Sequence, residues 1–441
     1  MEILIQALQL LLSLSILVVF HEFGHFIAAK IFKTRVEKFY LFFNPGFSIF
    51  KAKIGETEYG MGWLPLGGYV KISGMIDESM DKEQMKKPPE PHEFRSKPAW
   101  QRLIIMLGGV TVNIILAVLI YIFMLATWGE QYLPAKEAKY GIAADSLAYE
   151  MGLRNGDKII EVNNEEVESF NEIPGKIILD KAKTVTVIRN GEQKTIEIPQ
   201  GFISKMIERN EPRFIEPRIP YVVGRFSKDS PAKAAGLKKG DRVIALNGES
   251  MRFFDQYVEE IPQHKNETIT LTALRDGDTM NIDISVPEEG IIGVGPAALN
   301  NYFKIEKRSY SFLEAIPAGA KRAYEGVGGY IKQLQLIFSP EVKAYKSVGG
   351  FITIGSIFPS MWDWQAFWSL TAFLSIMLAI LNILPIPALD GGHVMFLLYE
   401  IISGRAPGEK FMEYAQIAGM LILLSILILA NGNDIMRLIS G

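Results

Sequence analysis

Two histidines and a glutamate near the amino terminus form the pattern with the clearest chemical meaning in this sequence. They stand in the run His21-Glu22-Phe23-Gly24-His25. Side chains at positions i and i+4 of a helix lie on the same face, so His21 and His25 can present their imidazoles to one metal ion. Glu22 would then lie beside the metal and could take a proton from a bound water. The alternative is a chance pair of helix-end histidines with a solvated glutamate, but ionisable side chains directly after a long uncharged stretch favour a functional site.

A catalytic zinc has three protein ligands and one open position for water. The chain has no cysteine, so the third ligand should be a histidine or a carboxylate. Asp390 and His393 both stand in the run Asn-Ile-Leu-Pro-Ile-Pro-Ala-Leu-Asp-Gly-Gly-His, whose prolines and glycines predict an irregular helix. Asp390 is the favoured ligand because it is the only carboxylate there, and His393 is its competitor. We expect His92 and His264 to be ordinary surface residues.

The elements that must position these groups are membrane helices. The chain has 441 residues, 49% of them hydrophobic and 22% charged, with a net charge of −3. The near-neutral charge argues against nucleic acid as a partner. Four stretches lack Asp, Glu, Lys and Arg and are long enough to cross a bilayer: Ile3–Phe20, Leu103–Trp128, Ala366–Leu389 and Tyr414–Asn433.

The loop between the first two stretches predicts the orientation of the chain. Lysine and arginine are frequent from Lys30 to Arg102, and the positive-inside rule therefore places this loop in the cytoplasm, with the insert 129–365 and both termini outside. We interpret the first stretch as a retained helix and not a removable signal peptide. Within the loop, strand-like residues broken by glycine predict a small β-sheet against the membrane, with a bend or close backbone approach at Gly67-Gly68.

The insert contains two copies of one pattern, 84 residues apart, which begin at Asp145 and Asp229. Each copy predicts a short helix, a Gly-Asp turn, a strand and a later hairpin. The pattern resembles the PDZ domain of bacterial proteases, which binds an extended peptide at a sheet edge and holds its carboxylate with backbone N–H groups. By position, the carboxylate loops should be Tyr140-Gly141-Ile142 and Val223-Gly224-Arg225. The alternative is that either module is a spacer or steric filter. After the modules, an amphipathic stretch from residue 311 to 338 could pack on the insert or lie at the membrane interface.

The complete pattern resembles the site-2 protease family of intramembrane zinc metalloproteases, with the bacterial sigma-E regulators as its closest branch. The resemblance implies one Zn²⁺ per chain, held by His21, His25 and Asp390, with Glu22 as catalytic base. It also implies that Asn382 helps to hold the substrate backbone and that the cytoplasmic sheet, near Gly67 and Gly68, accepts the substrate as an added strand. At two positions, Phe351 and Met377, the residue type differs from the family pattern. These differences bear on how the substrate is positioned and not on the metal ligands.

The predicted function is regulated intramembrane proteolysis in the cell inner membrane, with the PDZ modules on the periplasmic side and the active site near the cytoplasmic side. The resemblance points to substrates that are single-span proteins already shortened outside, such as anti-sigma factors and remnant signal peptides, which the PDZ modules would filter. Two other classes compete with this prediction: a non-catalytic membrane scaffold that recruits proteins through its PDZ modules, and a metal transporter.

The predicted fold is a polytopic α-helical membrane protein with four transmembrane helices, a small membrane-associated β-sheet and two tandem PDZ domains of the α/β class. Its predicted parts are the first transmembrane helix (1–29), the cytoplasmic loop (30–102), the second helix (103–128), the first PDZ domain (129–220), the second PDZ domain (221–308), the amphipathic segment (309–365), the third helix (366–403), and the fourth helix with the C-terminus (404–441).

Overall fold

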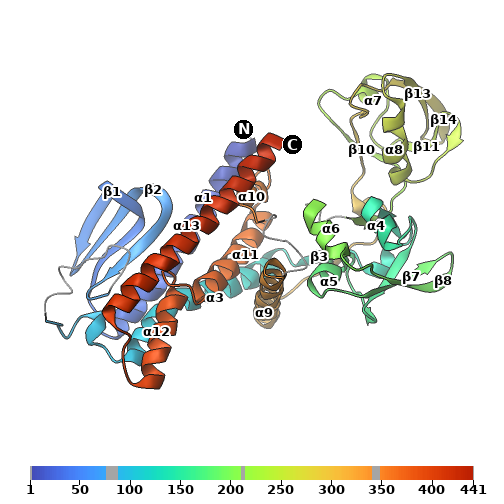
Figure 1. Cartoon of the computed structure of the whole chain (residues 1–441). Helices are drawn as coiled ribbons and strands as arrows, with labels where there is room; N and C mark the ends of the chain where they lie inside the picture. The colour runs from blue at the N-terminus through green and yellow to red at the C-terminus, as the bar shows by residue number, and fades with distance from the viewer. Residues whose placement is uncertain (1, 76–87, 210–213, 340–347, 441) are drawn as a thin grey trace. The chain divides into compact units, whose positions relative to one another are not determined.

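A computed structural model describes residues 2–75, 88–209, 214–339 and 348–440 (Figure 1). The chain forms two compact units. The helical unit is built from the residues up to Gly129, from Ser309–Ile337 and from the C-terminal region, and the second unit is built on Glu130–Arg308. The charged, proline-rich segment 81–91, whose composition predicts a linker, lies largely outside the described residues.

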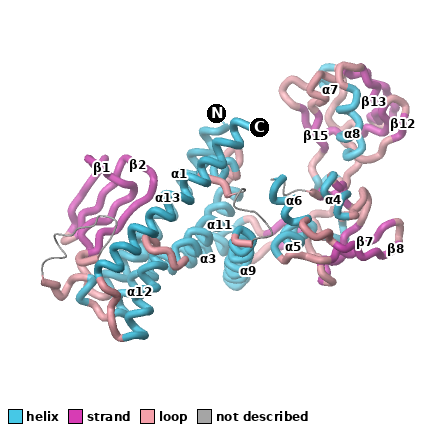
Figure 2. Tube along the Cα trace, viewed as in Figure 1, coloured by secondary structure: helices cyan, strands magenta, loops and turns pink. Residues whose placement is uncertain are grey.

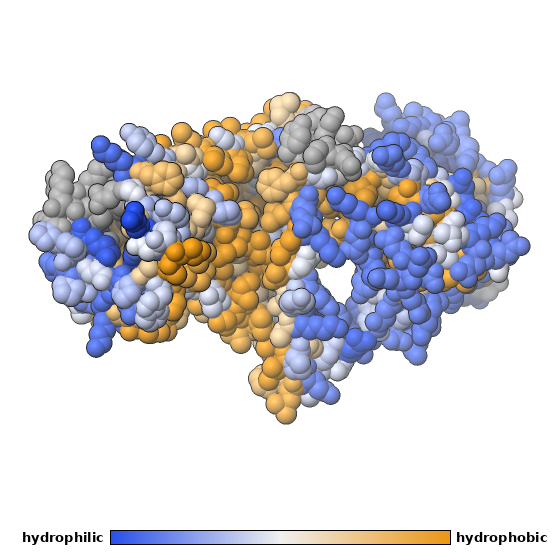
Figure 3. Space-filling view, turned by 60° about the horizontal axis from the view of Figure 1, so that its bottom comes forward, coloured by the Kyte–Doolittle hydropathy of each residue, from blue (hydrophilic) through white to orange (hydrophobic). Residues whose placement is uncertain are grey.

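Four helices of the helical unit are long and apolar enough to cross a membrane, which confirms the four predicted spans. A hydrophobic surface extends over this unit (Figure 3), as expected for side chains that face lipid. The first helix continues unbroken past the histidines, as predicted. The helices of the unit are α1 (Glu2–Ile31), α3 (Ala99–Thr127), α9 (Phe312–Ile337), α10 (Phe351–Ser356), α11 (Trp364–Ile383), α12 (Asp390–Ser403) and α13 (Glu409–Ser440).

Small residues allow α1 and α3 to approach closely. A Cβ added at Gly108 would lie only 2.7 Å from the carbonyl carbon of Gly24, so neither glycine can carry a side chain without moving the helices apart. Glycine at such crossings is a common device in membrane proteins, because tight packing replaces the hydrophobic drive that lipid removes. This crossing brings α3 next to the turn of α1 that carries both histidines.

The predicted cytoplasmic β-sheet is present as two long strands, β1 (Val36–Ile54) and β2 (Thr57–Ile72). Both strands fold back, so that Leu41 of β1 pairs with Met61 on one side and with Gly68 on the other. The last part of β2 is therefore an edge of the sheet, and β2 packs against α1 (Figure 2). Gly67 has φ +144°, and a Cβ at Gly68 would lie 2.7 Å from the Tyr40 carbonyl oxygen, which confirms the predicted close approach.

The second unit contains two modules whose four-stranded sheets have the same order, β6-β5-β7-β8 and β12-β11-β13-β14. Each module also has a two-stranded sheet, β4-β9 or β10-β15. The first module consists of β4 (Ile142–Ala144), α4 (Ser146–Met151), β5 (Lys158–Val162), β6 (Glu165–Glu166), α5 (Ile173–Leu179), β7 (Thr184–Arg189), β8 (Glu192–Glu197), α6 (Phe202–Arg209) and β9 (Ile215–Pro217). The second consists of β10 (Val223–Phe226), α7 (Pro231–Ala234), β11 (Arg242–Leu246), β12 (Glu249–Ser250), α8 (Phe254–Glu260), β13 (Thr268–Arg275), β14 (Asp278–Ser285) and β15 (Val294–Pro296). The strands β3 (Glu130–Tyr132) and β16 (Glu306–Arg308) pair where the unit begins and ends.

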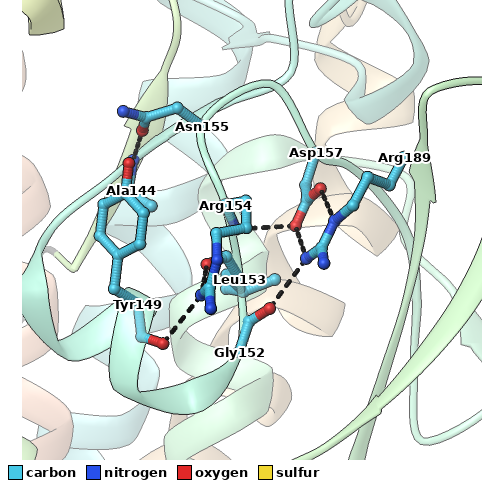
Figure 4. Close-up of polar contacts among 8 residues, drawn as sticks. All are labelled: Ala144, Tyr149, Gly152, Leu153, Arg154, Asn155, Asp157 and Arg189. Atoms are coloured by element: carbon cyan, nitrogen blue, oxygen red, sulfur yellow. Dashed lines mark hydrogen bonds and ion pairs between the residues drawn. The ribbon is translucent and has the colours of Figure 1, made fainter.

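The repeated Gly-Asp turn has a structural role in both modules. Asp157 accepts hydrogen bonds from the Arg154 backbone N–H at 2.8 Å and from the Arg189 guanidinium at 2.7 Å (Figure 4). Asp241 makes the same contacts with Lys238 and Arg275. In each case the carboxylate ties the turn to the end of a hairpin strand, so these aspartates stabilise the modules.

Candidate metal centre

Two helices of the helical unit bring three ligand atoms together. The Nε2 atoms of His21 and His25 lie 3.3 Å apart on α1, and they lie 3.2 and 3.3 Å from Oδ2 of Asp390, the first residue of α12. Three atoms bonded to one tetrahedral zinc at about 2.0–2.1 Å lie about 3.3–3.4 Å from one another. The three side chains therefore have the mutual spacing of zinc ligands before any movement.

The environment of Asp390 indicates a cation. Its Oδ2 atom is buried, and no group in the described part of the chain donates a hydrogen bond to it. A buried carboxylate oxygen is costly unless it is hydrogen-bonded, paired or bound to a metal. A divalent cation at equal distance from the three ligand atoms would satisfy Asp390 Oδ2 and both imidazoles together.

Neighbouring groups orient the two imidazoles. The Nδ1 atom of His25 lies 2.9 Å from the backbone carbonyl oxygen of Ile105, so Nδ1 carries the proton and Nε2 keeps its lone pair for a metal. The amide of Asn113 lies 3.2 Å from Nδ1 of His21. Its Oδ1 has no donor within the described residues. A half-turn of this amide offers Oδ1 to the Nδ1–H of His21, which would leave the Nε2 atom of that ring free as a ligand.

A cavity of about 500 Å³ lies beside the three ligand atoms. Glu22 lines this cavity together with Gly68–Ile72, the edge of β2. Val70 of this edge lies next to the Glu22 carboxylate. The cavity thus joins a potential base, the three ligand atoms and a strand edge, which are the components that peptide hydrolysis requires.

The break between α11 and α12 places Asp390 at the site. The helix ends at Ile383 and resumes at Asp390, as the prolines and glycines predicted. Added Cβ atoms at Gly391 and Gly392 would lie 2.5 Å from the Ile383 carbonyl carbon and 2.6 Å from the Pro387 Cα. The two glycines therefore let α12 begin directly against the end of α11, which turns its first side chain toward α1.

Comparison with known proteins identifies the family of this chain. Residues 9–426 match the family described as Peptidase family M50. The chain belongs to this family. The protease is 30% identical to a "Putative zinc metalloprotease" from Campylobacter jejuni, over 99% of this chain and 94% of the relative. A protein of the same description from Neisseria meningitidis is 29% identical, over 98% of this chain and 99% of the relative. The Regulator of sigma-E protease RseP from Escherichia coli is 26% identical, over 97% and 98%.

The family assignment decides between the three function classes. The protease is a zinc metalloprotease with Zn²⁺ as its cofactor, and not a scaffold or a metal transporter. With its four apolar helices, it is a multi-pass membrane protein. The assignment of individual residues to the site rests on the geometry described above.

The other predicted site residues have different positions. Asn382, on α11, has its Nδ2 atom 3.3 Å from Nε2 of His21, so it borders the ligand atoms. Among the described residues, the only candidate metal group is formed by His21, His25 and Asp390, and it does not include His393. His92 and His264 contact glutamates outside this group.

The two departures from the family pattern lie away from the ligand atoms. Met377 packs among the apolar side chains of the helix bundle. The backbone N–H of Phe351 donates to the side-chain oxygen of Asn431 on α13 at 3.3 Å. A proline at position 351 could not make this bond.

Several backbone N–H groups of the two predicted carboxylate loops are already hydrogen-bonded within the second unit. The N–H groups of Gly141 and Ile142 already donate to Ala138 and Asp157, and that of Val223 donates to Asp241. Gly224 lies inside β10, where it packs against β15, and not in a loop. These bonded N–H groups are not available to a peptide carboxylate, and the assignment of the two loops stays a prediction made from chain order.

Two positioning groups were missed by the sequence reasoning. The Ile105 carbonyl gives no signal in the sequence, because every residue has one. Asn113 could have been found as a polar side chain within an otherwise apolar span, which is a functional hypothesis by default.

Proposed function

We propose that this protease hydrolyses peptide bonds of membrane-spanning substrates at the site formed by His21, His25, Asp390 and Glu22. The observation that carries the proposal is the set of three ligand atoms 3.2–3.3 Å apart, next to a glutamate and a cavity edged by a strand. Zinc bound there would polarise the scissile carbonyl and activate a water molecule.

The chain's own groups carry the proton and hold the substrate. Glu22 accepts the proton of the attacking water and delivers it to the leaving amine. The edge Gly68–Ile72 pairs with the substrate as an added strand, which compensates for the helical hydrogen bonds that the substrate loses when it unwinds. Asn382, beside His21, donates its amide N–H to the substrate backbone.

Replacement of the base tests this mechanism. Glu22→Gln keeps the size of the side chain but removes the proton acceptor, so we expect cleavage of a transmembrane peptide to be lost while zinc content stays at one per chain. Glu130→Gln, in the second unit, is the matched control and should cleave normally. A Glu22→Gln protein that still cleaves would overturn the assignment of Glu22.

The repeated strand order of the second unit supports the proposal of two PDZ-like modules, with an open peptide groove in the second module. In the second module a cavity of about 180 Å³ lies between α8 and the segment Gly290–Val294. No described group accepts a hydrogen bond from the backbone N–H of Ile291, Ile292 or Gly293. Free consecutive N–H groups beside an apolar cavity are suited to a peptide carboxylate and its last side chain.

The first module differs in the segment before β9, of which residues 210–213 lie outside the described part of the chain. Between β8 and β9, the place of Gly290–Val294 in the chain order, it has the helix α6. Phe202 and Met206 of α6 are buried in the core of the first module. We therefore assign peptide binding to the second module and a structural or filtering role to the first.

The substrates proposed are single-span proteins of the inner membrane whose outer part has already been cut, such as anti-sigma factors and remnant signal peptides. The new C-terminus of such a protein is the group that the second module would bind on the periplasmic side. The basic loop 30–102 places the active site near the cytoplasmic side.

A peptide-binding measurement on the full chain tests the groove. Ile291→Glu places a negative charge next to the free N–H groups, and it should weaken the binding of a peptide that ends in a free valine carboxylate. The same peptide with an amidated C-terminus should bind the unaltered protease as weakly as the free peptide binds Ile291→Glu. Equal binding of the free and the amidated peptide would contradict a carboxylate site, without affecting the assignment of Glu22.

A further inference from the structure

Four of the polar side chains that are completely buried within the membrane helices lie close together, away from the cavity. Ser13 of α1, Asn113 of α3, and Thr371 and Ser375 of α11 are each 0% exposed. Polar groups in an apolar interior are costly unless they are hydrogen-bonded, so their presence in three different spans requires an explanation. We call these four residues the polar seam.

The polar seam connects the three helices that surround the metal ligands. The hydroxyl of Thr371 lies 3.0 Å from that of Ser13, which joins α11 to α1. The hydroxyl of Ser375 donates to the backbone carbonyl of Asn113 at 2.7 Å, which joins α11 to α3. The side chain of the same Asn113 lies 3.2 Å from the ring of His21. The bonds thus lead from the core of the bundle to a metal ligand.

The spacing of these residues along each helix shows why the polar seam affects the ligands. Ser13 and His21 are eight residues apart and lie on the same buried side of α1. Thr371, Ser375 and Asn382 are separated by four and seven residues, so they share one face of α11. That face ends at the break that leads to Asp390. A fixed register of α11 against α1 therefore sets how far Asp390 can lie from the two histidines.

The energetics of helix packing in a membrane favour these interhelical hydrogen bonds as the control of the α11 register. Between membrane helices the hydrophobic effect does not choose one register, so close packing and interhelical hydrogen bonds decide it. A slip of α11 by one residue would move it by about 1.5 Å along its axis. The zinc–ligand bonds vary only by about 0.2 Å. Small shifts of α11 would thus separate Asp390 from its partners.

We propose that the polar seam is a set of positioning residues for the metal centre. It holds α11 in one register against α1 and α3, and it thereby brings Asp390 and the His21 ring to the zinc-binding geometry. The affinity of the full chain for zinc then depends on hydroxyl groups that touch neither the metal nor the substrate.

Zinc affinity and the spectrum of bound Co²⁺ test this proposal on the full-length protein in detergent. Ser375→Ala removes one hydroxyl without adding volume, and we expect zinc affinity to fall by about threefold to tenfold, as for a lost buried hydrogen bond. The visible bands of tetrahedral Co²⁺ should weaken or shift in the same variant. Ser425→Ala removes an exposed hydroxyl that bonds only to Leu421 of its own helix, and it should leave both readouts unchanged.

A second variant keeps the test valid if Ser375→Ala does not fold. Thr371→Val is nearly isosteric and removes the contact with Ser13, together with a bond to the Phe367 carbonyl oxygen within α11, and it should weaken zinc binding in the same direction. The proposal is overturned if the variants lose thermal stability but bind zinc as tightly as the unaltered protein, with the same Co²⁺ spectrum. That result would make the polar seam a stabilising feature without influence on the ligands.

Discussion

At the scale of single residues, the metal centre depends on the absence of a side chain as well as on the ligands. Gly109 of α3 faces both imidazoles. A Cβ added there would lie 2.6 Å from Cε1 and 2.8 Å from Nδ1 of His21, and it would also overlap the ring of His25. The rings can therefore reach their positions only because residue 109 is glycine.

Substitution of this glycine gives a prediction at the residue scale. Gly109→Ala should displace the imidazoles and weaken zinc binding by about tenfold or more, in the range found for lost support of metal ligands. Gly328→Ala, in α9, meets no atom of the described residues within 4 Å and should bind zinc normally. Titration of both purified proteins with a competing chelator measures the difference, and equal affinities would show that the rings can move without cost.

At the scale of elements, the break between α11 and α12 carries strain. Ala388 has φ +86°, in the left-handed region that favours glycine. Strained residues of this kind gather at functional sites, where the surrounding structure holds them in place. Here the strained residue stands two positions before Asp390, so the backbone conformation of the break is part of what places the ligand.

Glycine and valine substitutions should have opposite effects at Ala388. Ala388→Gly should leave the free energy of unfolding unchanged or raise it by up to about 1 kcal/mol, whereas Ala388→Val should lower it by about 1–2 kcal/mol. Ala418→Gly, at an exposed position of α13, is the control. It should lower the free energy of unfolding by about 1 kcal/mol, because glycine weakens a helix. Thermal unfolding of the metal-free proteins measures these changes. If Ala388→Gly lowers the free energy of unfolding as much as the control does, the conclusion that the Ala388 backbone is strained is wrong.

At the scale of the whole molecule, the two units should respond differently to acid. In the second unit, burial raises the pKa of Asp241, but hydrogen bonds from Arg275 and the Lys238 backbone N–H outweigh it, so the pKa lies below its ordinary value. A lowered pKa in the folded state means that the ionised carboxylate stabilises the second module above about pH 4, the ordinary value. This stabilisation is lost as the pH falls through the lowered pKa.

The pH prediction concerns β11, the strand that begins beside Asp241. Its amide protection against hydrogen exchange, corrected for intrinsic rates, should decrease as the pH falls below about 4. In Asp241→Asn the protection should be lower at neutral pH and should change little with acid. Unchanged protection of the unaltered protein down to pH 2 would contradict the role of this carboxylate.

The sequence alone determined the chemistry of the site and the class of the fold. The spacing of His21 and His25 on a helix, the lack of cysteine and the single carboxylate after the proline-rich break led to the ligand set. Uncharged stretches predicted the four spans, because a lipid environment imposes a composition that is readable locally. Strand-like residues broken by glycine predicted the cytoplasmic sheet, because residue composition is also a local property of the sequence.

Only the tertiary structure decided which distant groups meet. The contact of Asn113 with His21, the Ile105 carbonyl and the polar seam join helices that are far apart in the chain. The N–H groups of Ile291, Ile292 and Gly293 could not be recognised as free from the sequence, because strand pairing, not chain order, decides which N–H groups are bonded. Local sequence patterns determine the helices and strands. The register and pairing of these elements depend on packing between segments that are distant along the chain.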